Sequence, residues 1–373
     1  MQVGVPRESR GDERRVAATP ETVGKMVAKG HTVVVEPGAG VASAVPDADY
    51  VAAGATLGDP WGCEMVIKVQ KPLATADGHE ADRLREGALL VSFLYPGDDA
   101  DLANRLRAKK ATVLAMEAVP RIARAQKMDA LSSMANIAGY RAVLEAVNVF
   151  GRYMPLLMTA AGTVPPAQVL IIGVGVAGLS AIATARRLGA VVKAFDTRPA
   201  VKDQVKSLGG EFLQIDLGHH DAEDAGGYAK AASEEHLRLE QELLAGACKA
   251  ADIVITTALI GGKTAPLLVT AATVASMRPG SVIVDLAVEG GGNCALSTRG
   301  EVVVHNGVTI IGHTNLPSRM AADASRLYAR NVFNLFTHLH GKTGFALDLA
   351  EEVTGGVTVM HGGVGRVPAL KES

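Results

Sequence analysis

The sequence predicts an α/β protein with two doubly wound, Rossmann-like domains, each built on a mainly parallel sheet and joined by long helices. Three observations lead to this fold class. The chain has 373 residues, which is enough for two packed cores. Short β-rich runs alternate with helical stretches in two separate blocks. A glycine-rich motif also stands directly between an apolar run and a helical stretch.

The first block of alternating segments lies before Pro120. Its β-rich runs predict strands at residues 3–5, 31–35, 65–69, 88–94 and 112–116, and its helical stretches predict helices at 20–29 and 101–109. Alternation of this kind is typical of βαβ units. We therefore expect a mainly parallel sheet in this part of the chain.

A long helix is expected next, at residues 128–150, where Gly139 is the one glycine and proline is absent. The second block begins at Gln168. It predicts strands at 169–172, 191–195, 211–215, 253–256 and 281–286, and helices at about 176–188, up to 208 and at about 233–248. Asn306-Gly307 lies between the β-rich runs 302–304 and 308–311, and it predicts a hairpin because both turn positions need positive φ.

A second long helix is expected at residues 321–339. The two long helices bracket the second block, so the simplest topology returns the end of the chain to the first domain. We therefore expect a discontinuous first Rossmann-like domain, residues 1–133 and 322–373. The second domain, residues 134–321, would bind the dinucleotide.

Composition and charge exclude several classes of function. The 37 Lys and Arg residues nearly balance the 39 Asp and Glu residues, which leaves no basic surface for nucleic acid. Cys63, Cys248 and Cys294 are far apart and without metal-ligand spacing, which indicates reduced thiols and no metal site. The charged start argues against an export signal. The uncharged run 167–185 contains three glycines, so we expect no membrane span.

The glycine-rich motif is Gly173-Val174-Gly175-Val176-Ala177-Gly178. In a dinucleotide-binding turn, the first glycine makes a tight turn, the second lets the pyrophosphate approach, and the third packs the helix on the strand. The helix that begins at Val176 and Ala177 would direct its N-terminus at the phosphates. The motif therefore predicts a dinucleotide site.

An acidic residue follows the motif at the spacing that such a site requires. Asp196 lies eighteen residues after Gly178, at the end of the next expected strand. A carboxylate there accepts hydrogen bonds from the adenosine ribose and repels a 2′-phosphate, so the expected cofactor is NAD(H) rather than NADP(H). The predicted binding set includes its neighbours Thr197 and Arg198, although Arg198 alone could pair with a 2′-phosphate.

A dehydrogenase acting on a second small substrate needs an acid or base group, and the sequence shows no clear one. The ten histidines are scattered. His313 follows an expected strand and could lie near the cleft, but a hydrogen-bonded loop histidine is the more ordinary interpretation. The polar segment 120–133, with Ser132 and Ser133 near a helix start, is on its own pattern a structural connector.

Six long runs of the sequence resemble one known family. They are VPRESRGDERRVAATPETV, PRIARAQKMDALSS, MTAAGTVPPAQVLIIGVGVAGLSAIATARRLGAVVKAFDTR, ITTALIGGKTAPLLV, VDLAVEGGGNCALS and GHTNLPSRMAADAS, and together they span nearly the whole chain. The family is the soluble NAD(H)-binding component, domain I, of proton-translocating nicotinamide nucleotide transhydrogenase. It is related to alanine dehydrogenase, which shares both domains.

The resemblance implies roles for residues that the pattern alone leaves open. Gln126 would contact the nicotinamide ribose and face the partner nucleotide, while Arg121 and Asp129 would position the carboxamide and its neighbours. The further cofactor contacts that the resemblance implies are Ser132, Ala258, Leu259 and Tyr228, the last on a mobile lid at residues 226–230.

The sequence departs from alanine dehydrogenase at three substrate positions. Tyr95 stands where the resemblance places the catalytic histidine, Gln70 where it places a substrate-binding lysine, and Glu289 where it places the catalytic aspartate. A tyrosine cannot act as a base at neutral pH, so oxidation of an amino acid would lose its proton acceptor. These differences favour the transhydrogenase interpretation.

The resemblance therefore implies an NAD(P) transhydrogenase subunit that transfers hydride directly between NADH and NADP⁺. NADP(H) would be bound on a partner beta subunit, and proton translocation would belong to a separate membrane subunit. We expect a homodimer, with a contact that includes the hairpin at 302–311, located peripherally on the cytoplasmic face of the membrane. Two alternatives stay open: an alanine dehydrogenase-like amino-acid dehydrogenase and a non-catalytic NADH sensor.

Overall fold

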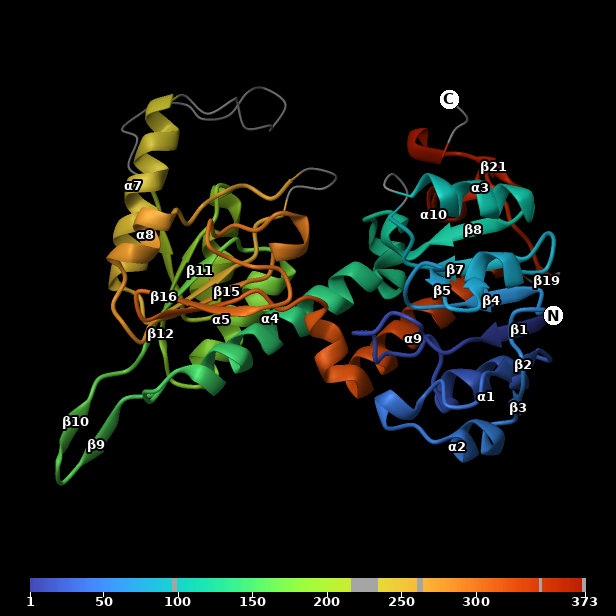
Figure 1. Ribbon diagram of the computed structural model, residues 1–373, viewed down its shortest axis with the longest axis horizontal. Helices are drawn as coiled ribbons and strands as arrows, with labels where there is room; N and C mark the ends of the chain where they lie inside the picture. The colour runs from blue at the N-terminus through green and yellow to red at the C-terminus, as the bar shows by residue number, and fades with distance from the viewer. Residues whose placement is uncertain (96–98, 216–233, 260–263, 342–343, 371–373) are drawn as a thin grey trace. The chain divides into compact units, whose positions relative to one another are not determined.

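The computed structural model describes residues 1–95, 99–215, 234–259, 264–341 and 344–370 (Figure 1). The chain divides into two compact units. Unit 1 consists of Met1–Met134 and Pro317–Ser373, and unit 2 consists of Ala135–Leu316. Unit 1 is discontinuous in sequence, and the chain returns to it at Pro317, where the prediction had residue 322. Among the described helices, none is both long enough and apolar enough to cross a bilayer.

Unit 1 contains an eight-stranded sheet in the order β21-β20-β8-β7-β4-β1-β2-β3. Its strands are β1 (Gln2–Val5), β2 (Thr32–Val35), β3 (Thr56–Leu57), β4 (Met65–Ile67), β7 (Leu89–Ser92), β8 (Thr112–Ala115), β20 (Thr358–His361) and β21 (Val364–Gly365). The strands from β8 to β3 pair in parallel, whereas β20 and β21 add antiparallel beside β8. The C-terminal segment therefore completes the first sheet.

Helices and short elements surround this sheet. The helices are α1 (Pro20–Ala28), α2 (Asp47–Ala52), α3 (Ala100–Ala108), α9 (Ala321–Leu339) and α10 (Glu352–Val357), and the 3-10 turn η4 (Ala123–Met128) leads into α4 (Ala130–Val149). Two small hairpins add β5 (Ala74–Thr75) with β6 (Gly78–His79), and β18 (His340–Gly341) with β19 (Gly344–Phe345). Buried Trp61, Leu90 and Leu106 belong to the apolar core on one side of the sheet.

Unit 2 contains a seven-stranded sheet in the order β13-β12-β11-β14-β15-β17-β16. The strands are β11 (Gln168–Ile172), β12 (Val191–Phe195), β13 (Glu211–Leu213), β14 (Ile253–Thr256), β15 (Val282–Asp285), β16 (Val302–His305) and β17 (Val308–Ile311). All but β16 pair in parallel, in the 3-2-1-4-5-6 order of dinucleotide-binding sheets. The two mainly parallel sheets confirm the predicted fold class.

Both faces of the second sheet are covered, which explains why its strands are apolar runs rather than alternating patterns. Val169 and Ile171 of β11 belong to the core beneath α4 and α5 (Val176–Arg187), while Leu170 and Ile172 point to the opposite core beneath α7 (Glu234–Ala250). The remaining helices are α6 (Lys202–Ser207) and α8 (Ala271–Ser276). The charge-free stretch 167–185 is thus a buried strand followed by a helix that packs on the sheet.

Two hairpins in unit 2 contrast in their predictability. Asn306 and Gly307 have φ angles of 50° and 79° and join β16 to β17, which confirms the predicted hairpin. The second hairpin, β9 (Leu157–Thr159) with β10 (Gly162–Val164), was not predicted. It projects from the sheet of unit 2 (Figure 1).

Candidate functional site

The candidate site lies at the carboxyl ends of β11 and β14 in unit 2. These two neighbouring strands are where the strand order reverses direction, and open parallel sheets bind their ligands at such a switch point. The glycine-rich turn follows β11, Asp196 follows β12, and Thr257 to Leu259 follow β14. The topology therefore brings together three of the predicted cofactor-binding segments.

The three glycines of the motif differ in their surroundings. Gly173 has φ of +96°, and a Cβ atom there would lie 2.6 Å from Thr257 Oγ1. A Cβ atom at Gly178 would lie 2.0 Å from the carbonyl oxygen of Gly173, whereas a Cβ atom at Gly175 would meet nothing within 4 Å. These distances fit a tight turn at the first glycine and a close helix contact at the third, and the exposed backbone at Gly175 leaves room for a phosphate.

Helix α5 begins directly after this turn, with Gly175 as its N-cap. Val176 is exposed and Ala177 half-buried at the first turn, so their amide groups lie at the end of the helix that favours anions. A Cβ atom at Gly139 of α4 would lie 2.0 Å from the carbonyl oxygen of Ala177. The close crossing of α4 and α5 therefore fixes the N-terminus of α5, a role for Gly139 that the sequence did not reveal.

Asp196 lies under the glycine-rich turn with its carboxylate 8% exposed. Val174 N donates to Asp196 Oδ2 at 2.7 Å, and Arg198 donates to both carboxylate oxygens from its main-chain and guanidinium nitrogens. Burial acts to raise the pKa of Asp196, but the hydrogen bonds from Arg198 and Val174 outweigh it and lower the pKa from its ordinary value. The carboxylate is therefore ionised at neutral pH and ready to accept further hydrogen bonds.

Arg198 is exposed and folds over this carboxylate. Its guanidinium also approaches the carbonyl oxygen of Val174 at 3.4 Å. The acid thus holds the arginine, as a site that disfavours a 2′-phosphate requires. Thr197 lies between them and is exposed.

The segment after β14 is tied to the glycine-rich turn. Thr257 N donates to the carbonyl oxygen of Ile172 at 2.8 Å, and Thr257 Oγ1 donates to that of Gly173 at 2.9 Å. Ala258 is half-buried, and Leu259 is 61% exposed. These residues therefore form a wall beside the turn, with an apolar side chain at its rim.

The predicted nicotinamide-binding residues, apart from Tyr228, belong to unit 1 or to the start of α4. Asp129 precedes α4 and acts as its cap: its Oδ1 accepts from Ser132 N at 2.8 Å, and its Oδ2 accepts from Ser132 Oγ at 2.6 Å. Arg121 and Gln126 are exposed. Tyr228 and the predicted lid lie outside the described residues.

Long-range contacts hold η4, the turn that carries Gln126. Asn331 and Asn334 of α9 both donate from Nδ2 to the carbonyl oxygen of Lys127, at 3.0 and 2.9 Å. Arg124 pairs with Glu351 and Glu352 at the start of α10. The polar segment that looked like a connector is therefore a fixed turn on the surface of unit 1.

A cluster of buried charges in unit 1 has no counterpart among the sequence predictions. Lys68 is fully buried, with Nζ 3.5 Å from Glu8 and 3.1 Å from Glu80. Arg15 pairs with Glu13 at 2.6 Å, and both are buried. These residues come from several loops, so no local pattern marks them.

The three positions that depart from alanine dehydrogenase are each engaged. Gln70 Nε2 donates to Glu13 Oε2 at 2.8 Å. Tyr95 has a φ of 50°, is 54% exposed and stacks on Phe93. Glu289 accepts from Asn315 N at 3.3 Å.

His313 lies with its Nε2 atom 3.9 Å from Glu145 Oε2, and its side chain is 17% exposed. This pairing favours the ordinary interpretation of His313 as a structural histidine. In the part of the chain that the structure covers, no group of three His, Cys, Asp or Glu side chains is arranged to hold a metal ion.

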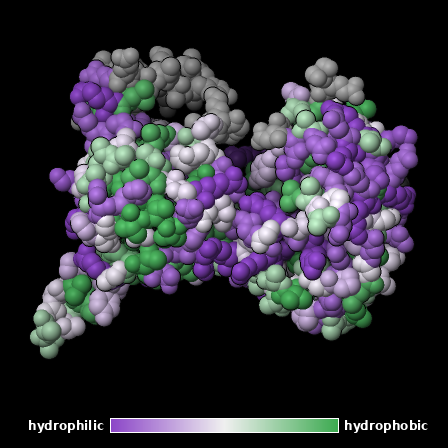
Figure 2. All heavy atoms as spheres, in the orientation of Figure 1, coloured by the Kyte–Doolittle hydropathy of each residue, from purple (hydrophilic) through white to green (hydrophobic). Residues whose placement is uncertain are grey.

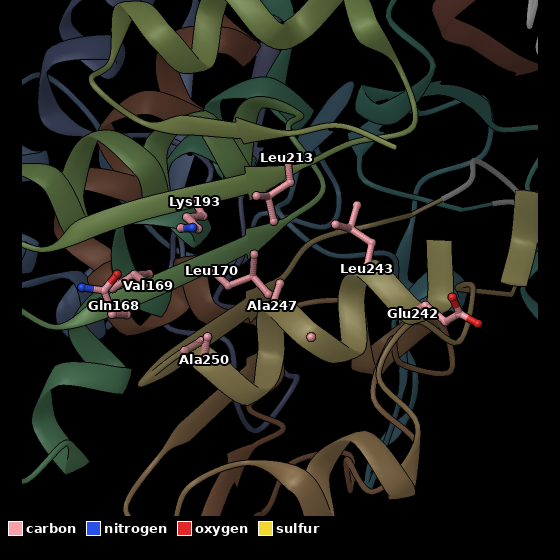
Figure 3. Close-up of a pocket in the computed structure, with 11 residues that line it drawn as sticks. Gln168, Val169, Leu170, Lys193, Leu213, Glu242, Leu243, Ala247 and Ala250 are labelled. Carbon is pink, nitrogen blue, oxygen red and sulfur yellow. The ribbon is translucent and has the colours of Figure 1, made fainter. Parts of the chain in front are cut away.

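A cavity of about 440 Å³ lies elsewhere in unit 2, between α7 and the strands β11 to β13 (Figure 3). Apolar side chains such as Leu170, Leu213 and Leu243 line it, together with Lys193 and Glu242. Of the predicted cofactor-binding residues that the structure describes, none borders this cavity. The glycine-rich turn, rather than the cavity, is therefore the candidate site.

Two stretches of the chain match models of one family. Residues 4–138 match the N-terminal domain of alanine dehydrogenase/PNT, and residues 142–366 match its C-terminal domain. The chain is 49% identical to the first polypeptide of the NAD(P) transhydrogenase alpha subunit of Rhodospirillum rubrum, over 99% of both chains. Alanine dehydrogenase of Mycolicibacterium smegmatis is more distant, at 34% identity over 78% of this chain and 74% of that protein.

Solved structures give the same order of similarity. Transhydrogenase from Sinorhizobium meliloti matches with a TM-score of 0.86 and 41% identity, over 99% of this chain and 100% of that one. An L-alanine dehydrogenase matches with a TM-score of 0.82 and 27% identity, over 99% and 98% of the two chains.

Proposed function

Because this chain belongs to the alanine dehydrogenase/PNT family, and within it to the transhydrogenase alpha subunits, we propose that it binds NAD(H) and exchanges hydride directly with NADP(H) on a partner subunit. The observation that carries the proposal is the ionised Asp196 beneath a glycine-rich turn at the switch point of unit 2. It is joined by a match to a transhydrogenase subunit over nearly the whole chain.

The adenosine end of NAD(H) fits the residues of unit 2. The exposed backbone at Gly175 and the first amides of α5 would receive the pyrophosphate. Asp196 would accept the ribose hydroxyls, which requires Arg198 to yield part of the carboxylate. An unpaired 2′-phosphate would meet the same negative charge, and this supports NAD(H) over NADP(H).

For the nicotinamide end, we assign Gln126, Arg121 and Asp129 to contacts with the ribose and carboxamide, with Ser132 as a further contact and Tyr228 as a closing side chain. The exposure of Arg121 and Gln126 supports this assignment, since side chains that bind a ligand must be accessible before it arrives. Ser132 already spends its hydroxyl hydrogen on Asp129, so its oxygen acts as an acceptor toward the cofactor.

Bound NADH supplies the hydride, and the chain's own task is alignment. Hydride transfer between two nicotinamide rings moves no proton at the reacting carbons, so this site needs no acid or base. The residues must bring the two C4 atoms to about 3 to 3.5 Å and exclude water. This explains how Tyr95 and Gln70 can stand where an amino-acid dehydrogenase needs a base and a cation.

The proposal includes partners. The second nucleotide would be bound by a beta subunit, and a membrane subunit would couple the reaction to proton translocation, with this chain peripheral on the cytoplasmic face. A homodimer is supported by the hairpin β9–β10, whose exposed residues include Leu156 and Met158, at 54% and 74% exposure. Figure 2 shows hydrophobic and weakly polar residues along this hairpin. The predicted contact through 302–311 remains a prediction.

The decisive experiment supplies this chain with NADH and the isolated NADP(H)-binding partner domain loaded with an NADP⁺ analogue whose reduced form has a distinct absorbance. Reduction that requires both proteins and retains deuterium from the C4 position of NADH supports the proposal. A matched assay offers the chain alone NAD⁺ and L-alanine. Steady turnover with alanine, or no transfer to the partner's nucleotide, contradicts the proposal.

A further inference from the structure

Asn293 lies beneath the segment that forms one wall of the candidate site. Its side chain is fully buried and reaches both sides of the loop that follows β14. Asn293 Oδ1 accepts from Ala258 N at 3.0 Å, and Nδ2 donates to the carbonyl oxygens of Ala258 at 2.9 Å and Pro266 at 2.8 Å. One amide group therefore joins the residues that enter this loop to those that leave it.

Asn293 is itself held by a buried carboxylate at the end of β15. Asp285 Oδ2 accepts from the main-chain nitrogens of Asn293 and Cys294, at 2.9 and 3.0 Å. Its Oδ1 accepts from Thr256 Oγ1 and from Ala287 N, both at 3.0 Å. Asp285 thus joins the ends of β14 and β15 to the turn that carries Asn293.

Two glycines allow this turn to approach the carboxylate so closely. Gly291 and Gly292 have φ angles of +106° and +85°. A Cβ atom at Gly292 would lie 2.8 Å from Asp285 Oδ2, and one at Gly291 would lie 2.9 Å from Thr264 Cγ2. Both the conformation and the space therefore require glycine, so the placement of Asn293 is built into the backbone.

The position of Ala258 is transmitted to the glycine-rich turn. Ala258 follows Thr257, which bonds to the carbonyl oxygens of Ile172 and Gly173. A Cβ atom at Gly173 would lie 3.1 Å from Ala258 N, so these backbones are already in close contact. A shift of Ala258 would therefore displace the turn that is to receive the pyrophosphate.

We infer that Asn293 is a positioning residue of the NAD(H) site, which acts by fixing Ala258 and hence the wall between β14 and the glycine-rich turn. This inference rests on the proposed NAD(H) site. Asn293 does not touch the cofactor. Because it occupies both backbone polar groups of Ala258, the contact that residues 258 and 259 offer to the cofactor is apolar.

Asparagine is the side chain that this position requires. It provides one acceptor and two donors in a plane, and all three are used. The aspartate variant N293D has the same shape but no donor when ionised, and it places a carboxylate against two carbonyl oxygens. Burial and the neighbouring Asp285 both raise the pKa of the introduced carboxyl group, and its protonated form regains one donor.

The test compares N293D, N293S and wild type by NADH titration at about pH 8 and about pH 5.5, since a raised carboxyl pKa falls between these values. We expect N293D to weaken NADH binding at least about tenfold at the higher pH and to recover most of that loss at the lower one. N293S should weaken binding at both pH values. Wild type measured in parallel corrects for titration of Asp285 and Cys294, which adjoin Asn293.

The matched control is Ser297→Ala, which removes a 2.8 Å hydrogen bond to the same Asp285 oxygen without touching Ala258. It should lower the melting temperature and leave the Kd for NADH within about twofold of wild type. Amide exchange in the peptide that contains Ala258 should accelerate in N293D and N293S but not in S297A. If N293D does not fold, N293S and S297A decide the question.

The inference is overturned if the residue-293 variants bind NADH like wild type, or if S297A weakens binding as much as they do. A wild-type chain that does not bind NADH would instead overturn the proposed function, so the two failures are distinguishable.

Discussion

Replacement of Asp196 by alanine tests the assignment of the adenosine end of NAD(H). In the ligand-free chain this carboxylate accepts hydrogen bonds from Val174 N and from Arg198. In the proposed complex it also accepts from the ribose hydroxyls. The variant removes a charged acceptor from a position with 8% exposure, where water cannot easily replace it.

The expected magnitude follows from the type of hydrogen bond. A hydrogen bond to a charged group is worth about 1.5 to 3 kcal/mol, so NADH binding should weaken about 10- to 150-fold. The variant also frees Arg198, which can then face a 2′-phosphate. The ratio of the Kd for NADPH to the Kd for NADH should therefore fall.

The assay is titration calorimetry with NADH and NADPH on the same preparations. The matched control is Arg198→Ala, which leaves the carboxylate and its bond to Val174 N in place. This control should bind NADH within about threefold of wild type, because Arg198 competes with the ribose for the same oxygens as well as orienting them. An Asp196→Ala chain with unchanged NADH affinity, or with an unchanged NADPH to NADH ratio, would refute the assigned role.

Three further predictions address hydride transfer, packing and pH. Gln126→Ala should slow transfer to the partner's nucleotide by a larger factor than it raises the Kd for NADH, because it is proposed to set geometry; equal losses in single-turnover rate and affinity would count against this. Gly139→Ala should destabilise unit 2 by about 1 to 3 kcal/mol in urea unfolding, since its Cβ would lie 2.0 Å from the Ala177 carbonyl oxygen, whereas Gly246→Ala, whose Cβ meets nothing within 4 Å, should not destabilise it. Burial acts to raise the pKa of Glu13, but hydrogen bonds and charge from Arg15 lower it to about 2, so its contribution, about 3 kcal/mol, is complete above about pH 4.5 and is lost as the pH falls toward 2. Urea unfolding at several pH values should show this loss in wild type and a smaller one in a Glu13→Gln, Arg15→Met double variant; the same slope in both would contradict it.

The parts of the fold that the sequence predicted are those set by local conformation and by burial. Asn306 and Gly307 need positive φ wherever they lie, and the apolar run at Gln168–Ile172 has to be a buried strand because both its faces are covered. The hairpin β9–β10 escaped prediction because its turn lacks an Asn-Gly signal and its strands lie in an uncharged stretch that resembled other apolar runs.

The candidate site divides along the same line. Each glycine of the motif has a reason that can be stated from one strand, one turn and one helix, so the motif could be interpreted before the fold was known. The partners of Asp196 were less accessible, because the guanidinium of Arg198 looked like a ligand-binding group until it was found bonded to the acid.

The residues that escaped altogether support the site rather than line it, and they share a physical property. Gly139, Asn293 and Asp285 act through contacts with segments 29 to 44 residues away, such as Ser180 with Asn136, Ala258 with Asn293 and Thr256 with Asp285. A motif records the groups that a ligand needs, whereas the geometry of those groups depends on which strands are neighbours. Since the order β11-β14-β15 places the ends of three non-consecutive strands side by side, a supporting residue on β15 or after it can control a turn after β11 without any spacing in the sequence that reveals it. For a reaction that depends on alignment rather than on acid or base groups, this supporting layer should therefore affect the rate of hydride transfer as strongly as the residues that contact the cofactor.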